Sequence, residues 1–182
     1  MTAARARALT IVGVLVIAAI VLTFVTISKD RQTHASYLST CPANSVPVVT
    51  KPLPPRSAIT IKVYNATNQP GLAATVAEDL QHRGYRVQPV GPHDDKPVVS
   101  AVANIYYGPN TVAAAWVVRA EFLMTRSSQV ADMKFNIKSK SPVVAVVIGK
   151  GFRQLGATTE VNQAIAALGT PPAPTGTCAR TG

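Results

Sequence analysis

The chain has 182 residues, enough for one folded domain with additional segments. Only 14% of the residues are charged, yet Lys and Arg outnumber Asp and Glu by 18 to 8 and give a net charge of +10. This charge attracts polyanions, but an aromatic content of only 5% argues against a nucleic-acid-binding protein that stacks bases. We therefore expect no nucleic-acid partner.

The first predicted element is an apolar segment near the N-terminus. Residues 9–27 carry no charged side chain, and a helix of this length, rising about 1.5 Å per residue, nearly crosses a hydrocarbon core of about 30 Å. Arg5 and Arg7 precede it, which favours a cytoplasmic location for residues 1–8. The alternative is a cleaved signal peptide, whose apolar core would be shorter, about 7–15 residues. We expect an uncleaved single-pass anchor in the inner membrane, with the C-terminal domain extracytoplasmic.

Residues 28–56 have the composition of a linker. Ser, Thr and Asn separate five prolines, which fix φ and oppose helix formation, so we expect an extended and partly stiff segment. These prolines are Pro42, Pro47, Pro52, Pro54 and Pro55. The alternative is that Val46, Val48 and Val49 form an edge strand on the domain.

Two cysteines lie in the flanks of the domain, Cys41 in the linker and Cys178 near the C-terminus. If the domain lies outside the cytoplasm, an oxidised state is expected, and an internal disulfide would tie the two ends of the domain together. The chain-entropy model gives about 4–5 kcal/mol for so long a loop. Two free thiols, or bridges between chains, are the alternatives. Two cysteines without a suitably placed histidine do not make a zinc site, so we expect no metal and no cofactor.

The best-defined stretch runs from Ser57 to Val87 and predicts strand, loop, helix and strand. Apolar and polar residues alternate from Ile59 to Tyr64, which is the period of a half-buried strand. Apolar residues then recur every four positions from Leu72 to Leu80, as they do on an amphipathic helix. Gly84 is placed to end that helix in a left-handed conformation.

The loop before this helix is the first candidate binding site. It contains Asn65, Thr67 and Gly71, and it ends where the unpaired N–H groups of a helix N-terminus can hold an anion or a sugar hydroxyl. The alternative is that Asn65 and Thr67 only shape the turn and cap the helix.

The later segments predict further strands and helices. We expect strands at 102–107, 133–137 and 143–148, a helix at 112–123 and a last helix at 158–168. The strand at 143–148 is nearly all apolar, as a central strand buried on both faces should be. This order of elements predicts a two-layer α/β domain with a mixed sheet.

A run of basic residues is the second candidate binding site. No acidic residue occurs from Met133 to Thr159, so the positive charge of this segment is unbalanced. The basic residues are Lys134, Lys138, Lys140, Lys150 and Arg153. The first three share strand parity if the strand continues, and would then form one face for an anionic wall polymer or phospholipid headgroups. The alternative is a solvated sheet edge whose charges discourage strand pairing.

Several short motifs carry a family resemblance. They are Val63-x-Asn65-x-Thr67, Gly71-Leu72-Ala73, Leu80-x-x-x-Gly84-Tyr85-x-Val87, and the segments 103–108 and 144–149. Over residues 57–149 the chain resembles the LytR C-terminal domain family, which leaves 150–182 as an additional C-terminal helix and tail. Two positions depart from the family pattern: Ala66 stands where glycine is common, and Lys150 where an acidic residue is frequent.

The resemblance implies a role in the bacterial cell envelope, where this small α/β module occurs. Larger relatives also carry a separate phosphotransferase domain, for which this chain has no room, so the resemblance implies a non-catalytic accessory module. Such a module would support envelope integrity or wall assembly by binding wall polymer, anionic lipid or an envelope-assembly protein. The alternative is a wall-glycan hydrolase or transferase, which needs a pocket of converging Asp, Glu, His or Tyr side chains. No motif predicts the oligomeric state.

Overall fold

The computed structural model describes residues 41–91, 99–123 and 130–181 of the chain. The chain divides into two compact units, and every element discussed below belongs to the second, Cys41–Gly182. The predicted cytoplasmic segment 1–8, the predicted anchor 9–27 and the first part of the predicted linker lie outside the described residues. Within the described ranges, no helix is both long enough and apolar enough to cross a membrane.

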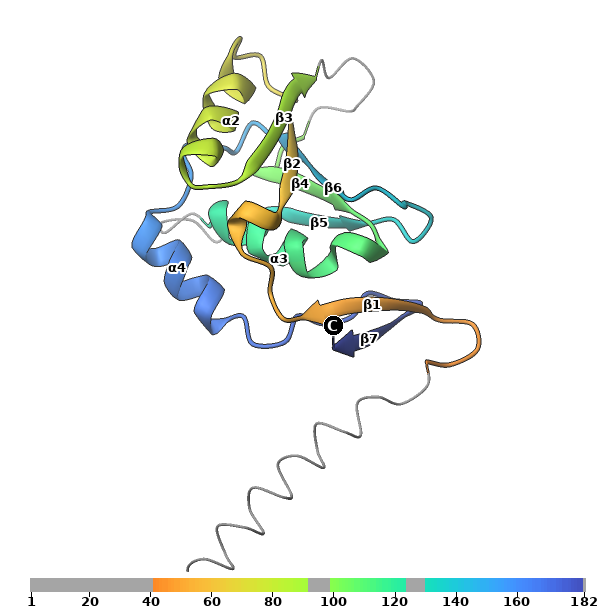
Figure 1. The fold of residues 1–182 in the computed structure, drawn as a ribbon. Helices are drawn as coiled ribbons and strands as arrows, with labels where there is room; N and C mark the ends of the chain where they lie inside the picture. The colour runs from red at the N-terminus through yellow and green to blue at the C-terminus, as the bar shows by residue number, and fades with distance from the viewer. Residues whose placement is uncertain (1–40, 92–98, 124–129, 182) are drawn as a thin grey trace, which may run out of the picture. The chain divides into compact units, whose positions relative to one another are not determined.

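A five-stranded mixed sheet forms the centre of the domain (Figure 1), in the order β3-β2-β6-β4-β5. The strands are β2 (Thr60–Asn65), β3 (Arg86–Gly91), β4 (Ala103–Tyr107), β5 (Asp132–Phe135) and β6 (Val143–Ile148). β2 runs parallel to β3 and β6, whereas β4 runs parallel to β5 and antiparallel to β6. The predicted α/β domain with a mixed sheet is therefore confirmed, and the apolar strand at 143–148 is its central strand.

Two helices cover one face of this sheet. The helices of the domain are α2 (Leu72–His82), α3 (Val112–Glu121) and α4 (Thr158–Ala167). Ile61 of β2 and Val146 of β6 lie in the same buried cluster as Leu80 of α2 and Val118 of α3, so α2 and α3 pack on the same side of the sheet. Burying one such side chain stabilises a fold by about 1.5–3 kcal/mol, and this face forms the main hydrophobic core.

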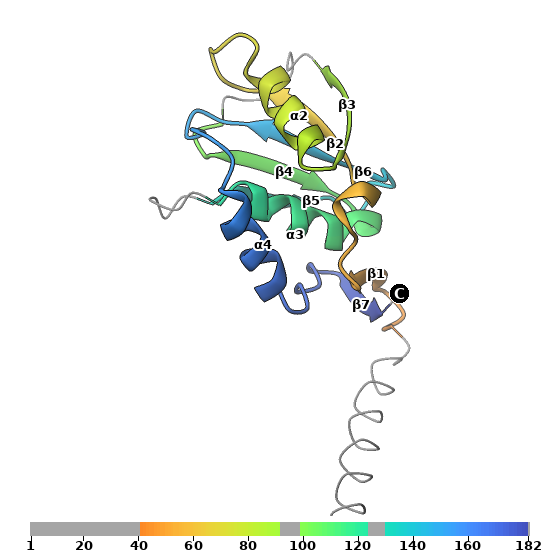
Figure 2. The same cartoon turned by 60° about the vertical axis from the view of Figure 1, so that its left-hand side comes forward.

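A two-stranded ribbon and α4 lie on the side of α3 that faces away from the sheet (Figures 1 and 2). β1 (Val46–Lys51) pairs in parallel with β7 (Thr177–Thr181). Val48 of β1 is 1% exposed and belongs to the main core cluster. The prediction of two layers is therefore incomplete, because the ribbon and α4 add a third layer over α3.

Part of the predicted linker belongs to the domain. Residues 46–51 form β1, and Arg56–Ala58 forms a short 3-10 helix, η2. The alternative prediction of a strand here was right about the strand, but β1 pairs with β7 instead of the edge of the main sheet. Other elements differ from the predicted ranges by one or two residues at an end: β4 begins at Ala103, α3 ends at Glu121, β5 runs from Asp132 to Phe135, and α4 ends at Ala167.

The composition of α3 explains its central position. Almost all of its side chains are apolar, which is typical of a helix that is buried all round. Val112 and Val118 are fully buried, and Trp116 is partly buried and packs against the core. Glu121, the last residue of the helix, is also 0% exposed. A carboxylate is rarely buried to this extent without a partner, so its surroundings form a third candidate site.

Candidate functional site

The predicted ligand loop before α2 is held by its own side chains. Asn65 Oδ1 accepts hydrogen bonds from the backbone N–H of Thr67 at 2.9 Å and from its hydroxyl at 2.7 Å. Asn65 Nδ2 donates to the carbonyl of Gln69 at 2.6 Å, and Gly71 has a φ of +77°, which favours glycine. These bonds favour the turn-shaping interpretation. Ligand binding by Asn65, Thr67 and Gly71 stays a prediction.

The strand parity expected for the first three basic residues does not form. β5 ends at Phe135, and Asn136 begins a turn in which its Oδ1 accepts the backbone N–H of Lys138 at 3.0 Å. Lys134 therefore lies on β5, where its ammonium is 3.7 Å from the carboxylate of Asp132, whereas Lys138 and Lys140 lie in the loop before β6. The chain turns at Asn136 because its side chain competes for backbone hydrogen bonds.

The other two basic residues lie beyond the opposite end of β6. Lys150 and Arg153 follow Ile148, and the backbone N–H of Lys150 donates to the carbonyl of Val99 at 2.8 Å. A strand of this length spans about 17–20 Å, so Lys138 and Lys140 lie at one end of β6 and Lys150 and Arg153 at the other. The five residues therefore lie in two groups, and the strand that was to place Lys134, Lys138 and Lys140 on one face ends at Phe135.

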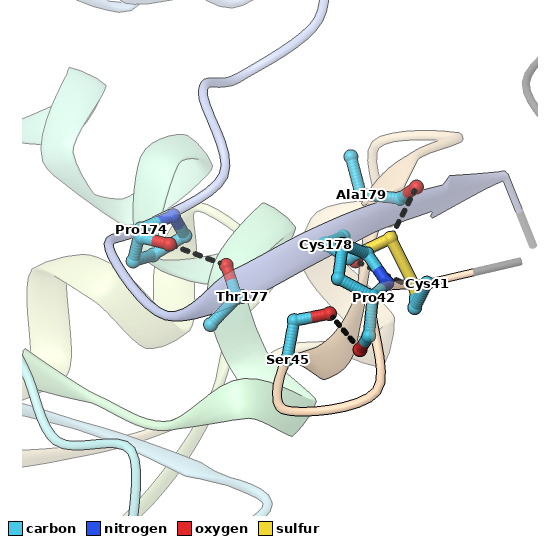
Figure 3. Close-up of a disulfide and its surroundings, with 7 residues drawn as sticks. All are labelled: Cys41, Pro42, Ser45, Pro174, Thr177, Cys178 and Ala179. Atoms are coloured by element: carbon cyan, nitrogen blue, oxygen red, sulfur yellow. Dashed lines mark hydrogen bonds between the residues drawn. A yellow bond between two sulfur atoms is a disulfide. The ribbon is translucent and has the colours of Figure 1, made fainter. Parts of the chain in front are cut away.

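The two cysteines are joined in a disulfide at the start of the β1–β7 ribbon (Figure 3). The Cα atoms of Cys41 and Cys178 are 5.7 Å apart, although 137 positions separate them in the sequence. The turns on either side are closed by hydroxyl groups: Ser45 Oγ donates to the carbonyl of Pro42 at 2.9 Å, and Thr177 Oγ1 donates to that of Pro174 at 2.6 Å. The structure therefore contains the internal disulfide that was predicted, and not the alternatives of two free thiols or bridges between chains.

The buried carboxylate of Glu121 accepts hydrogen bonds from three side chains. Arg56 Nε donates to Oε1 at 2.9 Å, Arg83 Nη1 donates to Oε2 at 2.7 Å, and the Tyr85 hydroxyl donates to Oε1 at 2.8 Å. The guanidinium of Arg56 also lies 5.9 Å from the centre of the Tyr85 ring. We call these four residues the Glu121 cluster. The carboxylate of Glu121 is completely buried and forms two ion pairs. A buried charge is tolerated when it is paired and hydrogen-bonded in this way.

The three side chains that donate to Glu121 come from different parts of the chain and meet at the end of α3. Arg56 begins η2, Arg83 is the C-cap that follows α2, and Tyr85 lies immediately before β3. Gly84 lies between the last two with a φ of +93°, a left-handed conformation that turns the chain from helix to strand. The turn lets Arg83 and Tyr85 approach the same carboxylate.

An open cavity of about 470 Å³ adjoins the Glu121 cluster. Its walls are apolar side chains together with two guanidinium groups, one amide and one hydroxyl. The lining residues are Pro54, Pro55, Arg56, Ser57, Arg83, Gly84, Val117, Asn162 and Ile165. Arg56 Nη2 donates to Asn162 Oδ1 at 2.8 Å, and Arg83 Nη1 donates to the carbonyl of Gly156 at 2.8 Å, so both arginines are held in place at the cavity wall.

The arrangement of the Glu121 cluster is suited to holding charge. Burial and then the adjacent carboxylate raise the pKa of the Tyr85 hydroxyl well above its usual value, which keeps the phenol neutral and donating. Burial opposes the charge of Arg56, but its hydrogen bonds to Glu121 and Tyr85 raise its pKa overall. Glu121 is surrounded by donors and 0% exposed, so it is not placed to exchange a proton with a substrate.

We expect Tyr85→Phe to lower the free energy of unfolding by about 1.5–3 kcal/mol at neutral pH, because a hydrogen bond to a charged acceptor is lost. The pKa of the Tyr85 hydroxyl is higher in the folded protein than in the unfolded chain. Its contribution to the free energy of unfolding is therefore complete below about pH 10 and is lost as the pH rises further. The gap between wild type and variant should therefore shrink by about 1.4 kcal/mol per pH unit above pH 10. Urea unfolding at several alkaline pH values measures it. A gap that stays constant across this range would contradict the predicted rise in pKa.

A family model described as the LytR cell envelope-related transcriptional attenuator, LytR_C, matches residues 58–152. The chain belongs to this family. Three members of the Glu121 cluster, Arg83, Tyr85 and Glu121, lie inside the LytR_C segment, whereas Arg56 lies just before it. Asn162 on α4 lies after it, so residues flanking the family module complete the cavity wall.

Among solved structures, the soluble domain of a conserved hypothetical secreted protein from Mycobacterium marinum is similar to this LytR_C chain. The two share 20% sequence identity with a TM-score of 0.47, and the match covers 65% of this chain and 90% of that one. No curated protein matches the chain.

Proposed function

We propose that this chain is a non-catalytic module of the bacterial cell envelope. A membrane anchor at residues 9–27 holds the Cys41–Gly182 unit outside the cytoplasm, where it supports envelope integrity or wall assembly by binding wall polymer, lipid or an envelope protein. The observation that carries the proposal is the match of residues 58–152 to a cell-envelope-related family. The Cys41–Cys178 disulfide supports an extracytoplasmic location, since such bridges persist in oxidising compartments.

The Glu121 cluster supports a binding role over a catalytic one. To act as a general acid or base, Glu121 would need its carboxyl group within hydrogen-bond reach of a substrate, but it is buried and already accepts three hydrogen bonds. Among the described residues, those that line the cavity beside it include no Asp, Glu or His. The alternative of a wall-glycan hydrolase or transferase therefore has no specific observation in its favour.

The basic residues offer two contact groups for an anionic polymer. Lys138 and Lys140 are exposed at one end of β6, and Lys150 and Arg153 are exposed at the other. The spacing of the two groups suits an extended polyanion better than a single compact headgroup, because one chain can pass both ends of the strand.

We expect the full-length protein, purified in detergent, to capture anionic wall fragments from an envelope digest. Neutralising Lys138, Lys140, Lys150 and Arg153 together with glutamine should remove most of this capture and make the remainder insensitive to salt, because the attraction between exposed charges is screened. Sedimentation of wall fragments with bound protein, followed by quantification of the protein, measures the effect.

A charge-matched control separates local contacts from net charge. Lys51 and Arg180 lie on the β1–β7 ribbon, away from β6, and replacing both with glutamate lowers the net charge by the same four units. Equal loss of capture in both variants would show that net charge, and not the two groups at the ends of β6, determines binding of the wall fragments. Absence of capture by the wild type, with crosslinking in intact cells also yielding no envelope partner, would refute the proposed function.

A further inference from the structure

The cavity beside the Glu121 cluster contains unused hydrogen-bond donors. A guanidinium group carries five N–H donors. Arg56 uses Nε and Nη2, and Arg83 uses Nη1. Within the described part of the chain, Nε and Nη2 of Arg83 make no hydrogen bond. The side chains of Arg56 and Arg83 are 24% and 21% exposed and both line the cavity, so a ligand there can reach part of each side chain.

The charge around the cavity is not balanced. Two guanidinium groups meet one carboxylate, and that carboxylate lies behind them, completely buried. The Glu121 cluster, whose two arginines line the cavity, thus carries an excess of one positive charge in a partly desolvated setting, where an ion pair is stronger than in open water. One added negative charge would restore neutrality.

Apart from Ser57 and Asn162, the remaining walls of the cavity are apolar. Pro54 and Pro55 form one side, and Val117 and Ile165 contribute from α3 and α4. A ligand that fits both kinds of wall needs an oxyanion for the two arginines and an apolar body for the prolines and aliphatic side chains. The cavity volume of about 470 Å³ accommodates a small molecule or the end of a longer one.

We propose that this cavity binds an amphipathic oxyanion, a carboxylate or phosphate group attached to an apolar chain. Arg56 and Arg83 hold the oxyanion, Asn162 keeps Arg56 in position, and Pro54, Pro55 and Ile165 contact the apolar part. The inference deepens the proposed binding function and rests on it for the source of the ligand. Because Pro54, Pro55, Arg56, Asn162 and Ile165 lie outside residues 58–152, this specificity belongs to the flanks of the chain.

The test uses the full-length protein in nanodiscs of phosphatidylcholine, titrated calorimetrically with short soluble probes. Hexanoate and hexyl phosphate carry both required features, hexanol lacks the charge, and glucose 1-phosphate and inorganic phosphate lack the apolar chain. We expect saturable binding of the first two and at least about tenfold weaker binding of the other three, since charge-assisted hydrogen bonds and buried methylenes each contribute on that scale. Glucose 1-phosphate binding as tightly as hexyl phosphate would overturn the apolar part of the proposal, and equal binding of hexanol would overturn the oxyanion part.

A matched pair at Ser57 tests the location of the site without disturbing Glu121. Ser57 lines the cavity and is exposed, so Ser57→Glu places a carboxylate beside the two arginines while Ser57→Gln adds the same bulk without charge. We expect about tenfold loss of hexanoate affinity for Ser57→Glu and little change for Ser57→Gln. Equal affinity in both variants would overturn the assignment. Capture of wall fragments, measured on Ser57→Glu in parallel, shows whether the basic groups at the ends of β6 act without the cavity.

Discussion

Replacing Glu121 with leucine is expected to lower the free energy of unfolding by about 3–5 kcal/mol, the usual cost of breaking a buried ion pair by removing one partner. The variant leaves the hydroxyl of Tyr85 and the guanidinium groups of Arg56 and Arg83 without their common acceptor. The phenol is affected most, because Tyr85 is 4% exposed and cannot recover its hydrogen bond from solvent. Urea denaturation followed by circular dichroism measures the loss.

A second substitution at the same position separates charge from shape. Glu121→Gln keeps an oxygen acceptor and nearly the same volume, so its loss should be smaller than that of the leucine variant. Glu78→Gln on the exposed side of α2 removes the same charge from the surface and should change stability by less than about 0.5 kcal/mol. A Glu121→Leu protein no less stable than the Glu78 control would show that the buried cluster does not support the fold.

The main sheet was predictable because its signals are local. Alternation from Ile59 to Tyr64 and the apolar run at 143–148 each determine a strand within six residues, and the four-residue repeat of α2 needs only three turns. Such patterns record which side of a strand or helix is buried, and they can be recognised without knowing which other elements pack against that side. The observed sheet, in the order β3-β2-β6-β4-β5, contains every strand that has a signal of this kind.

Within the third layer, the β1–β7 ribbon has a weaker local signal than α4. β1 contains three valines, but Pro47 lies within it and Pro52 follows it, and β7 follows a proline-rich tail, so each segment by itself is typical of an extended linker. They form a ribbon because they pair with each other across more than a hundred residues. Only the two cysteines gave an early indication that these ends meet, since a bridge between them requires proximity.

The Glu121 cluster was missed because it is assembled entirely by tertiary structure. Its carboxylate is separated by 65 positions from Arg56, by 38 from Arg83 and by 36 from Tyr85. One signal was available: Glu121 is the sole acid at the end of a helix that is otherwise apolar apart from Arg119. A charged side chain in a helix that must be buried predicts a partner, though not which one.

The basic residues show how a local signal can mislead. The predicted common face of Lys134, Lys138 and Lys140 assumed a strand that continues beyond Phe135. Asn136 ends it instead, by accepting the backbone N–H of Lys138. A side chain that competes for backbone hydrogen bonds outweighs a weak strand pattern. The positions of Lys138 and Lys140 are therefore set by the loop after β5 and not by the alternation of side chains along a strand.

Replacing Cys41 and Cys178 together with serine is expected to remove at most about 4–5 kcal/mol of stability, the value that the chain-entropy model gives for a bridge spanning 137 positions. The loss arises mainly in the unfolded chain, which gains conformations when its ends are released, whereas β1 keeps its packing because Val48 and Thr50 are buried. Thermal and urea unfolding of the oxidised wild type and the double variant measure the difference.

Reduction of the disulfide with dithiothreitol is the matched control for the double serine variant. Dithiothreitol should lower the stability of the wild type to that of the Cys41→Ser, Cys178→Ser protein and leave the variant unchanged, because the disulfide is its only target in the chain. If the fold needs the bridge only to restrict the unfolded chain, the reduced protein still forms the β1–β7 ribbon, and protection of the Val48 amide from hydrogen exchange decreases no more than global stability does. A much larger decrease at Val48 would mean that the bridge holds the ribbon in place, and that the cavity walls at Pro54 and Pro55 depend on it as well.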